Sequence, residues 1–266
     1  MATRLAAQNL ELAYNRSVVV DDLTLTLPDG GFTVIIGPNA CGKSTLLKAL
    51  SRTLRPTAGR VLLDGVPINS LRSKTVARQL AMLPQSPITP EAITVRDLVG
   101  RGRYPHQTLL RQWSADDETA VANALAATSI TELQDRYVAE LSGGQRQRAW
   151  IALILAQQTE LLLLDEPTTF LDIAHQYEVL ELCARLHADG RTLVVVLHDL
   201  NQAARYASHL VVMKAGVIVA EGIPSEILTA GLVEEVFGLP CVVVADPETG
   251  TPMVVPQAGA RRRPTP

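Results

Sequence analysis

The sequence predicts an α/β fold built around a parallel sheet, and two observations lead to this expectation. First, short apolar runs at residues 34–36, 161–164 and 193–197 suit strands that are buried on both faces, and they are separated by segments with helical spacing. Strands that alternate with helices pair in parallel through right-handed crossovers. Second, the first run leads directly into a glycine-rich loop of the pattern GxxxxGK[ST] at residues 37–44, which joins a strand to a helix in phosphate-binding folds.

The composition is that of an ordinary globular protein. The chain has 266 residues, of which 47% are hydrophobic and 19% charged, enough for one large core with an inserted lobe. The formal net charge of −3 does not suggest a nucleic-acid partner, which would require a clustered basic face. The three cysteines lie far apart, which argues against a disulfide framework and favours a reducing compartment.

The N-terminal segment lacks the features of a signal peptide, and the longest apolar runs fall far short of the roughly 20 residues that span a bilayer. We therefore expect this chain to act at a membrane only through a partner.

The elements before residue 88 should form antiparallel strands and the first part of the core. Leu23, Leu25 and Leu27 alternate with threonines, which is the two-residue period of a strand with one buried face. We expect a helix over residues 44–54, ended by Pro56 and followed by a strand at 60–63 with a tight turn at 64–65. Residues 1–87 are thus an N-terminal β subdomain with the first part of the core.

Residues 88–138 change in character and predict a helical lobe inserted into the core. Two helix starts, Thr94 with Asp97 and Ser114 with Asp117, pair a capping hydroxyl with a carboxylate in the first turn. The core should resume over residues 139–240. Residues 241–266 should form a hairpin around 246–250 and a disordered tail.

The loop at 37–45 is the strongest indication of function. Glycines allow successive backbone N–H groups to point at phosphate oxygens, and the following helix adds its positive end. Lys43 supplies a charge for the outer phosphates, and the Ser44 hydroxyl is suited to Mg²⁺. The candidate nucleotide-binding residues are Gly37, Pro38, Asn39, Ala40, Cys41, Gly42, Lys43, Ser44 and Thr45.

Two further segments match this loop in chemistry. A buried strand ends in Asp165, where a carboxylate can hold Mg²⁺, and the adjacent Glu166 can face an attacking water as a general base. Ser142, Gly143, Gly144 and Gln145 form a capping box with two glycines in the first helical turn. Those glycines cost about 1 kcal/mol each, which favours a surface where phosphate must touch bare backbone over a merely structural helix.

Three residues remain ambiguous when they are considered one at a time. His198 follows a strand and could contact a phosphate, although a lone histidine is more often structural. Gln85 by itself indicates nothing. Tyr14 could stack on an adenine ring or pack in the core.

Taken together, these residues resemble the nucleotide-binding subunit of an ABC transporter along nearly the whole chain. In that resemblance Tyr14 is the aromatic residue that stacks on adenine, residues 37–45 are Walker A, Gln85 is the Q-loop and residues 141–145 are the signature. Asp165 and Glu166 end Walker B, Asp172 belongs to the D-loop and His198 is the switch histidine. Five segments further resemble the ATPases of ferric-siderophore importers, those of the ferric-enterobactin type among them. They are residues 102–106, 142–152, 165–172, 198–210 and 250–256. Ala40 departs from the glycine of many relatives, and we expect only a slight change in the loop.

The resemblance implies a RecA-like P-loop core with an N-terminal antiparallel β subdomain and an inserted helical lobe, the ABC ATPase fold. It implies ATP and Mg²⁺ as cofactors, with Ser44, Gln85 and Asp165 at the metal and Glu166, His198 and Gln85 in catalysis. It also implies a homodimer in which Ser142, Gly143, Gly144, Gln145 and Asp172 act in trans on the ATP of the partner.

The expected partners are transmembrane permease subunits and, indirectly, a substrate-binding protein. Permease helices should dock on the lobe near Arg101, Arg103, Tyr104 and Trp113. The cargo could instead be vitamin B12 or haem. A non-transport ABC ATPase and a phosphate-loop kinase are the alternatives from other classes. The first would need a long heptad segment, tandem ATPase domains or a basic face, and the second would have no use for residues 141–145.

Overall fold

The computed structural model describes residues 4–15, 17–88, 92–108 and 113–258, and its centre is a six-stranded sheet. The strand order is β10-β9-β3-β8-β7-β6, and all neighbours are parallel except the edge pair β9 and β10. The alternation of apolar runs with helices is thereby confirmed as the signal of a parallel sheet. The strands are β3 (Phe32–Ile36), β6 (Leu80–Leu83), β7 (Leu161–Asp165), β8 (Thr192–Val196), β9 (His209–Lys214) and β10 (Val217–Gly222).

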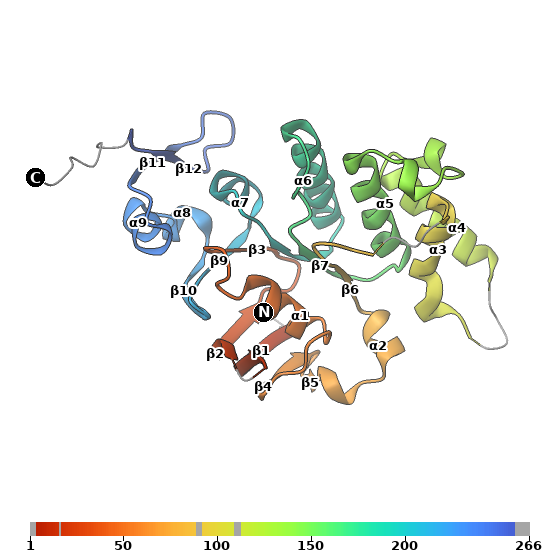
Figure 1. Cartoon of the computed structure of the whole chain (residues 1–266), viewed down its shortest axis with the longest axis horizontal. Coiled ribbons are helices and arrows are strands. Elements are labelled where there is room, and N and C mark those ends of the chain that lie inside the picture. The colour runs from red at the N-terminus through yellow and green to blue at the C-terminus, as the bar shows by residue number, and fades with distance from the viewer. Residues whose placement is uncertain (1–3, 16, 89–91, 109–112, 259–266) are drawn as a thin grey trace, which may run out of the picture.

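A second, antiparallel sheet lies beneath the first in Figure 1 and has the order β2-β1-β4-β5. The expected alternation holds, because Leu23, Leu25 and Leu27 are buried while the threonines between them are exposed. The turn between the last two strands uses Asp64 at φ 50° and Gly65 at φ 77°, as in a hairpin turn of two left-handed residues. The strands are β1 (Leu5–Tyr14), β2 (Ser17–Leu27), β4 (Ala58–Leu63) and β5 (Val66–Pro67).

Helix α1 (Lys43–Leu50) lies between the two sheets, and its leucines pack against both. It ends earlier than the sequence suggested. Arg52 adopts φ 65°, and the N–H groups of Thr53 and Leu54 both turn back to the carbonyl of Lys48. A left-handed residue after the last turn stops an α-helix, and no local apolar pattern reveals it.

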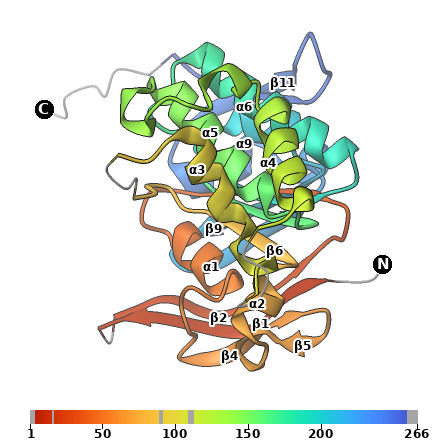
Figure 2. The same ribbon diagram turned by 90° about the vertical axis from the view of Figure 1, so that its right-hand side faces the viewer.

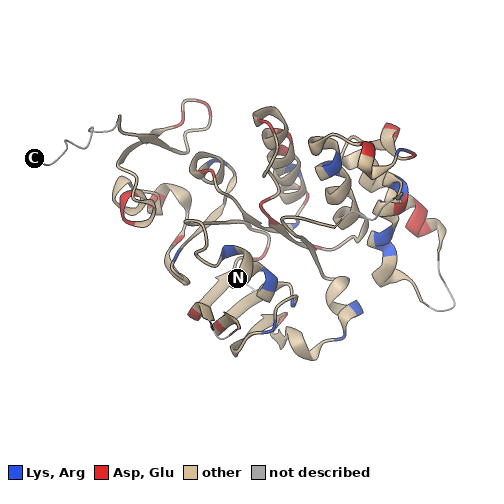
Figure 3. Ribbon diagram, in the orientation of Figure 1, with Lys and Arg blue, Asp and Glu red and all other residues tan. Residues whose placement is uncertain are grey.

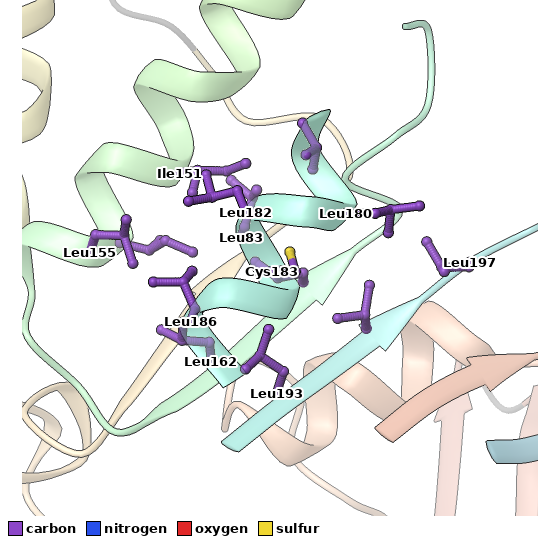
Figure 4. Close-up of a cluster of buried hydrophobic side chains, with 14 of the residues drawn as sticks. Leu83, Ile151, Leu155, Leu162, Leu180, Leu182, Cys183, Leu186, Leu193 and Leu197 are labelled. Carbon is purple, nitrogen blue, oxygen red and sulfur yellow. The ribbon is translucent and has the colours of Figure 1, made fainter. Parts of the chain in front are cut away.

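The other face of the central sheet is covered by helices, and the main hydrophobic core lies there. Figure 4 shows the leucines of α5, α6, β7 and β8 meeting around the fully buried Cys183. Burial of this apolar face is what holds the helices to the sheet. The helices are α3 (Val95–Gly100), α4 (Ala115–Ala127), α5 (Gly143–Ala156), α6 (Ile173–Ala188) and α7 (Leu200–Tyr206).

Helices α3, α4 and α5 gather at one end of the sheet (Figures 1 and 2), and they pack on one another. Both predicted helix starts are confirmed: Thr94 caps α3, and Ser114 caps α4 in a full capping box with Asp117. Acidic and basic residues are intermixed on this group of helices (Figure 3). Shorter helical turns connect the elements, at α2 (Ser73–Ala77), η1 (Ile68–Ser70), η2 (Arg101–His106), η3 (Thr131–Leu133) and η4 (Val138–Glu140).

Arg103 corrects one expectation about the lobe. Its side chain is buried, with its Nε 2.7 Å from Asp117 Oδ1 and its Nη1 donating to the Ala156 carbonyl at 2.7 Å. A side chain enclosed in this way cannot reach a partner protein. Arg103 therefore joins η2, α4 and the end of α5, while Arg101, Tyr104 and Trp113 are exposed.

The C-terminal part contains the hairpin expected from the sequence, and two short helices precede it. Helices α8 (Pro224–Ile227) and α9 (Ala230–Phe237) precede the hairpin of β11 (Cys241–Ala245) and β12 (Pro252–Pro256). Helix α7 holds the hairpin, because the amide of Asn201 bonds the backbone of Val254 in both directions. The tail at 259–266, expected to be disordered, lies outside the described residues. Within the part of the chain that the structure describes, no helix is both long and apolar enough to cross a bilayer.

Candidate functional site

The glycine-rich loop connects β3 to α1 and folds tightly on itself. At Gly37 a Cβ atom would lie 2.2 Å from the Met213 carbonyl oxygen and 2.7 Å from Cys41 Sγ, so only glycine fits. Lys43 is buried, and its Nζ donates to the carbonyls of Gly37 at 2.8 Å and Pro38 at 2.9 Å. The ammonium group of Lys43 is therefore held inside the loop, where it can attract an anionic ligand.

Ala40 and Cys41 lie in the middle of the loop, and Ala40 stands where many relatives carry glycine. Ala40 has φ 60°, a left-handed conformation in which Cβ is unfavourable, so the substitution stores backbone strain rather than being neutral. Cys41 is 4% exposed. Burial raises the pKa of its thiol, and the nearby charge of Lys43 offsets only part of this effect. The thiol is therefore a packing group of the loop at neutral pH.

Ser44 and Asp165 form the first contact between two predicted motifs. Ser44 Oγ donates to Asp165 Oδ1 at 2.8 Å, and the carboxylate is buried at the end of β7. Burial raises the pKa of Asp165 and the charge of Glu166 adds to this, against the hydrogen bond from Ser44. A cation here would relieve that penalty.

This hydroxyl and carboxylate fit Mg²⁺. Such an ion takes one or two protein oxygens and completes its octahedron with phosphates and water. Consistent with so sparse a site, the described residues contain no cluster of three or more His, Cys, Asp or Glu side chains that could hold a metal. The third expected ligand, Gln85, bonds elsewhere in this structure.

The carboxylate of Glu166 contacts two of the remaining candidate residues, Gln85 and His198. This carboxylate is 8% exposed, with His198 Nε2 2.6 Å from Oε1 and Thr169 Oγ1 3.1 Å from Oε2. Gln85 Nε2 also donates to Oε2. Glu166 has φ 51°, a left-handed backbone conformation, and its partners differ from the Ser44 hydroxyl that bonds Asp165. Adjacent carboxylates thus serve different partners, as expected.

These groups line one open cavity of about 820 Å³. The phosphate loop forms one side, and Gln85, Glu166 and His198 form the other. The lining residues are Val19, Asn39, Ala40, Cys41, Gly42, Lys43, Ser44, Thr45, Gln85, Glu166 and His198.

Two residues differ from expectation at this cavity. Tyr14 is 42% exposed at the end of β1 and is not among the lining residues. Val19 of β2 does line the cavity, and sequence reasoning missed it. A β-branched residue in a strand has the appearance of core, so no local signal could have singled it out.

The capping box of α5 is formed as predicted, with Ser142 N donating to Gln145 Oε1 at 3.1 Å and Gln145 N donating to Ser142 Oγ at 3.3 Å. The two glycines have different surroundings. A Cβ at Gly143 would meet nothing closer than 3.8 Å, whereas one at Gly144 would lie 2.7 Å from His175 Cδ2. Packing against α6 therefore accounts for Gly144 without any phosphate, which sequence reasoning did not foresee.

Neither the capping box nor Asp172 lines the cavity of its own chain. Asp172 caps α6 through His175 N at 2.9 Å. Beside it, Phe170 and Ile173 are 89% and 74% exposed. Large apolar side chains held in water next to polar ones are typical of a surface that another protein covers.

The comparisons with known proteins account for these motifs together. The profile of the ABC transporter family matches residues 20–169. The chain belongs to the ABC transporter family. Like other ATP-binding subunits of the family it is an ATPase whose hydrolysis of ATP is coupled to transport.

Its relatives in this family match over almost their whole length. The ferric enterobactin transport ATP-binding protein FepC of Escherichia coli (strain K12) is 56% identical over 95% of this chain and 94% of its own. The probable siderophore transport ATP-binding protein YusV of Bacillus subtilis (strain 168) is 52% identical over 97% and 94%.

Among solved structures, an inward-facing conformation of a metal-chelate type ABC transporter superposes with a TM-score of 0.83 at 30% identity, covering 97% of this chain and 98% of that one. The dimeric bacterial ABC transporter cassette MJ0796 superposes with a TM-score of 0.74 at 25% identity, over 82% and 98%. The RecA-like P-loop core and the ABC ATPase fold are thereby confirmed.

Proposed function

We propose that this ABC ATPase energises the uptake of a ferric siderophore through a partner permease, on the cytoplasmic face of a bacterial inner membrane. Four relatives, named for ferric enterobactin, siderophore, petrobactin and achromobactin transport, are 51–56% identical over at least 95% of this chain. The hemin import protein HmuV of Thermobifida fusca (strain YX) is 39% identical, within the range of two further petrobactin import proteins at 43% and 36%. The observation that carries the catalytic part is Glu166, which contacts both Gln85 and His198 across the cavity from the phosphate loop.

The loop residues Gly37 to Thr45 would hold the triphosphate of ATP. Their N–H groups and Lys43 face the outer phosphates, and Ser44, Asp165 and Gln85 are assigned as the protein ligands of Mg²⁺. When bound, the ion neutralises charge on the β- and γ-phosphates. Tyr14 is assigned to the adenine ring, supported by its exposed aromatic face at the end of β1.

Glu166 would act as general base. It accepts a proton from a water molecule as the water oxygen attacks the γ-phosphorus. The bond from that phosphorus to the bridging oxygen breaks, and ADP keeps the electron pair. His198, 2.6 Å from the carboxylate, would hold Glu166 in place and sense the γ-phosphate.

Each active site would be completed by a second copy of the chain. Ser142, Gly143, Gly144, Gln145 and Asp172 are assigned to the ATP of the partner, because none of them lines the cavity of its own chain. Asp172 also lies beside the exposed side chains of Phe170 and Ile173. The γ-phosphate would then bridge the two surfaces, and its loss would let them separate.

The permease would dock in an apolar groove directly after Gln85. This groove of about 400 Å³ contains Ile88, 89% exposed, and is lined by Met82, Leu83, Pro84, Ser86, Pro87, Ile88, Trp150, Leu153 and Ile154. Since Gln85 bonds Glu166, a helix pressed into the groove would act on the catalytic base. Arg101, Tyr104 and Trp113 would border the same partner, and a substrate-binding protein would deliver the cargo.

The test is Glu166→Gln. The variant should bind ATP with near-normal affinity and hydrolyse it about 10²–10⁴-fold more slowly, because the amide cannot accept the proton. It should also accumulate as a dimer in ATP, visible by light scattering. Glu160→Gln is the matched control, since Glu160 lies at the opposite end of β7 with its side chain 77% exposed. Normal turnover by Glu166→Gln would rule out its role as base.

A further inference from the structure

The first turn of α6 connects Asp172 to the signature helix α5 through one side chain, His175. On one edge of the imidazole, Nδ1 lies 2.7 Å from Asp172 Oδ1, the same oxygen that accepts the backbone N–H of His175 at 2.9 Å. Two contacts to one oxygen fix the rotamer of a carboxylate whose side chain is otherwise 67% exposed.

The opposite edge of the same ring packs against Gly144. A Cβ there would lie 2.7 Å from His175 Cδ2 and 3.2 Å from Nε2, so the imidazole occupies the space that glycine leaves open. Gly144 is buried by this packing, and it lies in the signature turn whose Ser142 and Gly143 are exposed. The ring is thus wedged between the two groups assigned to the neighbouring ATP.

One ion pair joins α6 to α5 beside the imidazole. Arg148 of α5 forms an ion pair with Glu178 of α6, whose Oε2 is 4.0 Å from His175 Nε2. Such a pair is exposed enough to contribute little stability, but it sets the register of the two helices. The charged groups around the imidazole are therefore Asp172 and Glu178 on its own helix and Arg148 across from it.

Gln176 makes the corresponding connection on the other side. Its Nε2 donates to the carbonyl of Leu171 at 3.1 Å, and its Oε1 accepts from Gln202 Nε2 at 2.8 Å. Gln202 is buried on α7, the helix that follows His198 and is capped by Asp199. Residues 171–172, just before α6, are thus connected to α5 through His175 and to α7, which follows His198, through Gln176.

We propose that His175 is a positioning residue that holds Asp172 and the signature turn around Gly144 in one fixed arrangement for closure over the partner's ATP. This inference rests on the proposed function, since it needs a site shared between two chains. With Nδ1–H donating to Asp172, the imidazole keeps the aspartate from sampling other rotamers in the open state. Closure then orders fewer groups, which lowers the entropic cost of forming the dimer.

Three variants separate the hydrogen bond from the shape of the ring. His175→Asn keeps a donor near the position of Nδ1, His175→Phe keeps a ring without a donor, and His175→Ala removes both. We expect His175→Phe and His175→Ala to lower kcat by about tenfold with the KM for ATP changed less than about twofold, while His175→Asn retains most of kcat. A merely structural histidine would not produce this order.

Wild-type kcat in His175→Phe, or equal losses in His175→Asn and His175→Phe, would overturn the inference. His187→Ala is the matched control. His187 lies in the last turn of the same helix and bonds the Gly30 carbonyl, so its loss should affect stability but not kcat. Should His175→Ala fail to fold, the other two variants still decide the outcome.

Dimerisation distinguishes this inference from the proposed function. In ATP, Glu166→Gln should dimerise, and Glu166→Gln with His175→Phe should need about tenfold more protein to do so. Equal dimerisation would overturn the role of His175 and leave the shared site standing. If Glu166→Gln itself stays monomeric with ATP bound, the shared site fails and the role of His175 fails with it.

Discussion

At the scale of single residues, Ala40 carries strain that can be measured. Its left-handed φ of 60° costs an L-residue about 1–2 kcal/mol, whereas glycine adopts it freely. Glycine also gives the unfolded chain more conformational freedom, which lowers the free energy of unfolding by about 0.4–1 kcal/mol and offsets part of the relieved strain. We expect Ala40→Gly to raise the free energy of unfolding by about 0.5–1 kcal/mol, measured by urea denaturation without nucleotide.

Ala49→Gly is the internal comparison for this prediction. Ala49 lies in the buried interior of α1, where glycine should instead destabilise the protein by about 1 kcal/mol. A destabilised Ala40→Gly variant would show that the loop conformation is not the source of strain.

The same scale shows what could be predicted of the site. The phosphate loop, Asp165 and Glu166 were identifiable because each motif carries its own chemistry. Gln85 and His198 could be identified only through the family resemblance and not from their own residues, because their role depends on sheet order. Strands β6 and β8 flank β7, so the residues after these strands converge on Glu166. The order of strands in a sheet is a long-range property that local sequence does not encode. Arg103 was misjudged for the same reason, since its partner Asp117 and the end of α5 meet it only in the folded chain. The packing of Gly144 on His175 was missed likewise.

At the scale of elements, the helical lobe depends on one buried ion pair. Arg103 and Asp117 have side chains only 5% and 7% exposed, and Arg103 also bonds Ala156 and Gln158 at the end of α5. Removing one partner of a buried pair leaves an uncompensated charge and costs about 3–5 kcal/mol. Arg103→Ala should therefore lose about 3 kcal/mol in denaturant unfolding, whereas Arg101→Ala, on the exposed side of the same turn, should lose little.

The pair also sets how the lobe responds to acid. Burial raises the pKa of Asp117, but the hydrogen bonds from Arg103 and Ser114 and the charge of Arg103 outweigh it, so the pKa lies below its usual range. A carboxyl whose pKa is lowered in the folded state stabilises the protein at pH values above its unfolded-state pKa, which is near 4. This stabilisation is lost as the pH falls through the folded-state pKa. Arg103→Ala should thus move acid unfolding to higher pH. An unchanged acid midpoint would contradict a stabilising role for this pair.

At the scale of the molecule, the proposed function places the two parts of each active site on different chains. The cavity contains the phosphate loop and Glu166, while the signature turn and Asp172 are displayed elsewhere. A surface that is complementary to another part of the same molecule forms a closed pair only around a twofold axis. Phe170 and Ile173, exposed beside Asp172, would be covered in that pair. The motifs predict such a pair, and the separation of the phosphate loop from the signature turn in the folded chain supports this prediction.

Mixing two inactive chains tests this arrangement. Ser142→Arg keeps its phosphate loop and loses the signature surface, whereas Lys43→Ala keeps the signature and loses its own nucleotide. Neither should hydrolyse ATP alone. In a mixed dimer, the intact loop of the first faces the intact signature of the second, so one of two sites is restored. Since half of randomly formed dimers are mixed, an equimolar mixture should recover up to about a quarter of wild-type turnover. The control is a mixture of Ser142→Arg with a chain that carries both substitutions. The doubly substituted chain lacks the phosphate-loop lysine and the signature surface, so this mixture should recover no turnover. Turnover in the first mixture no higher than in this control would contradict a site shared between chains.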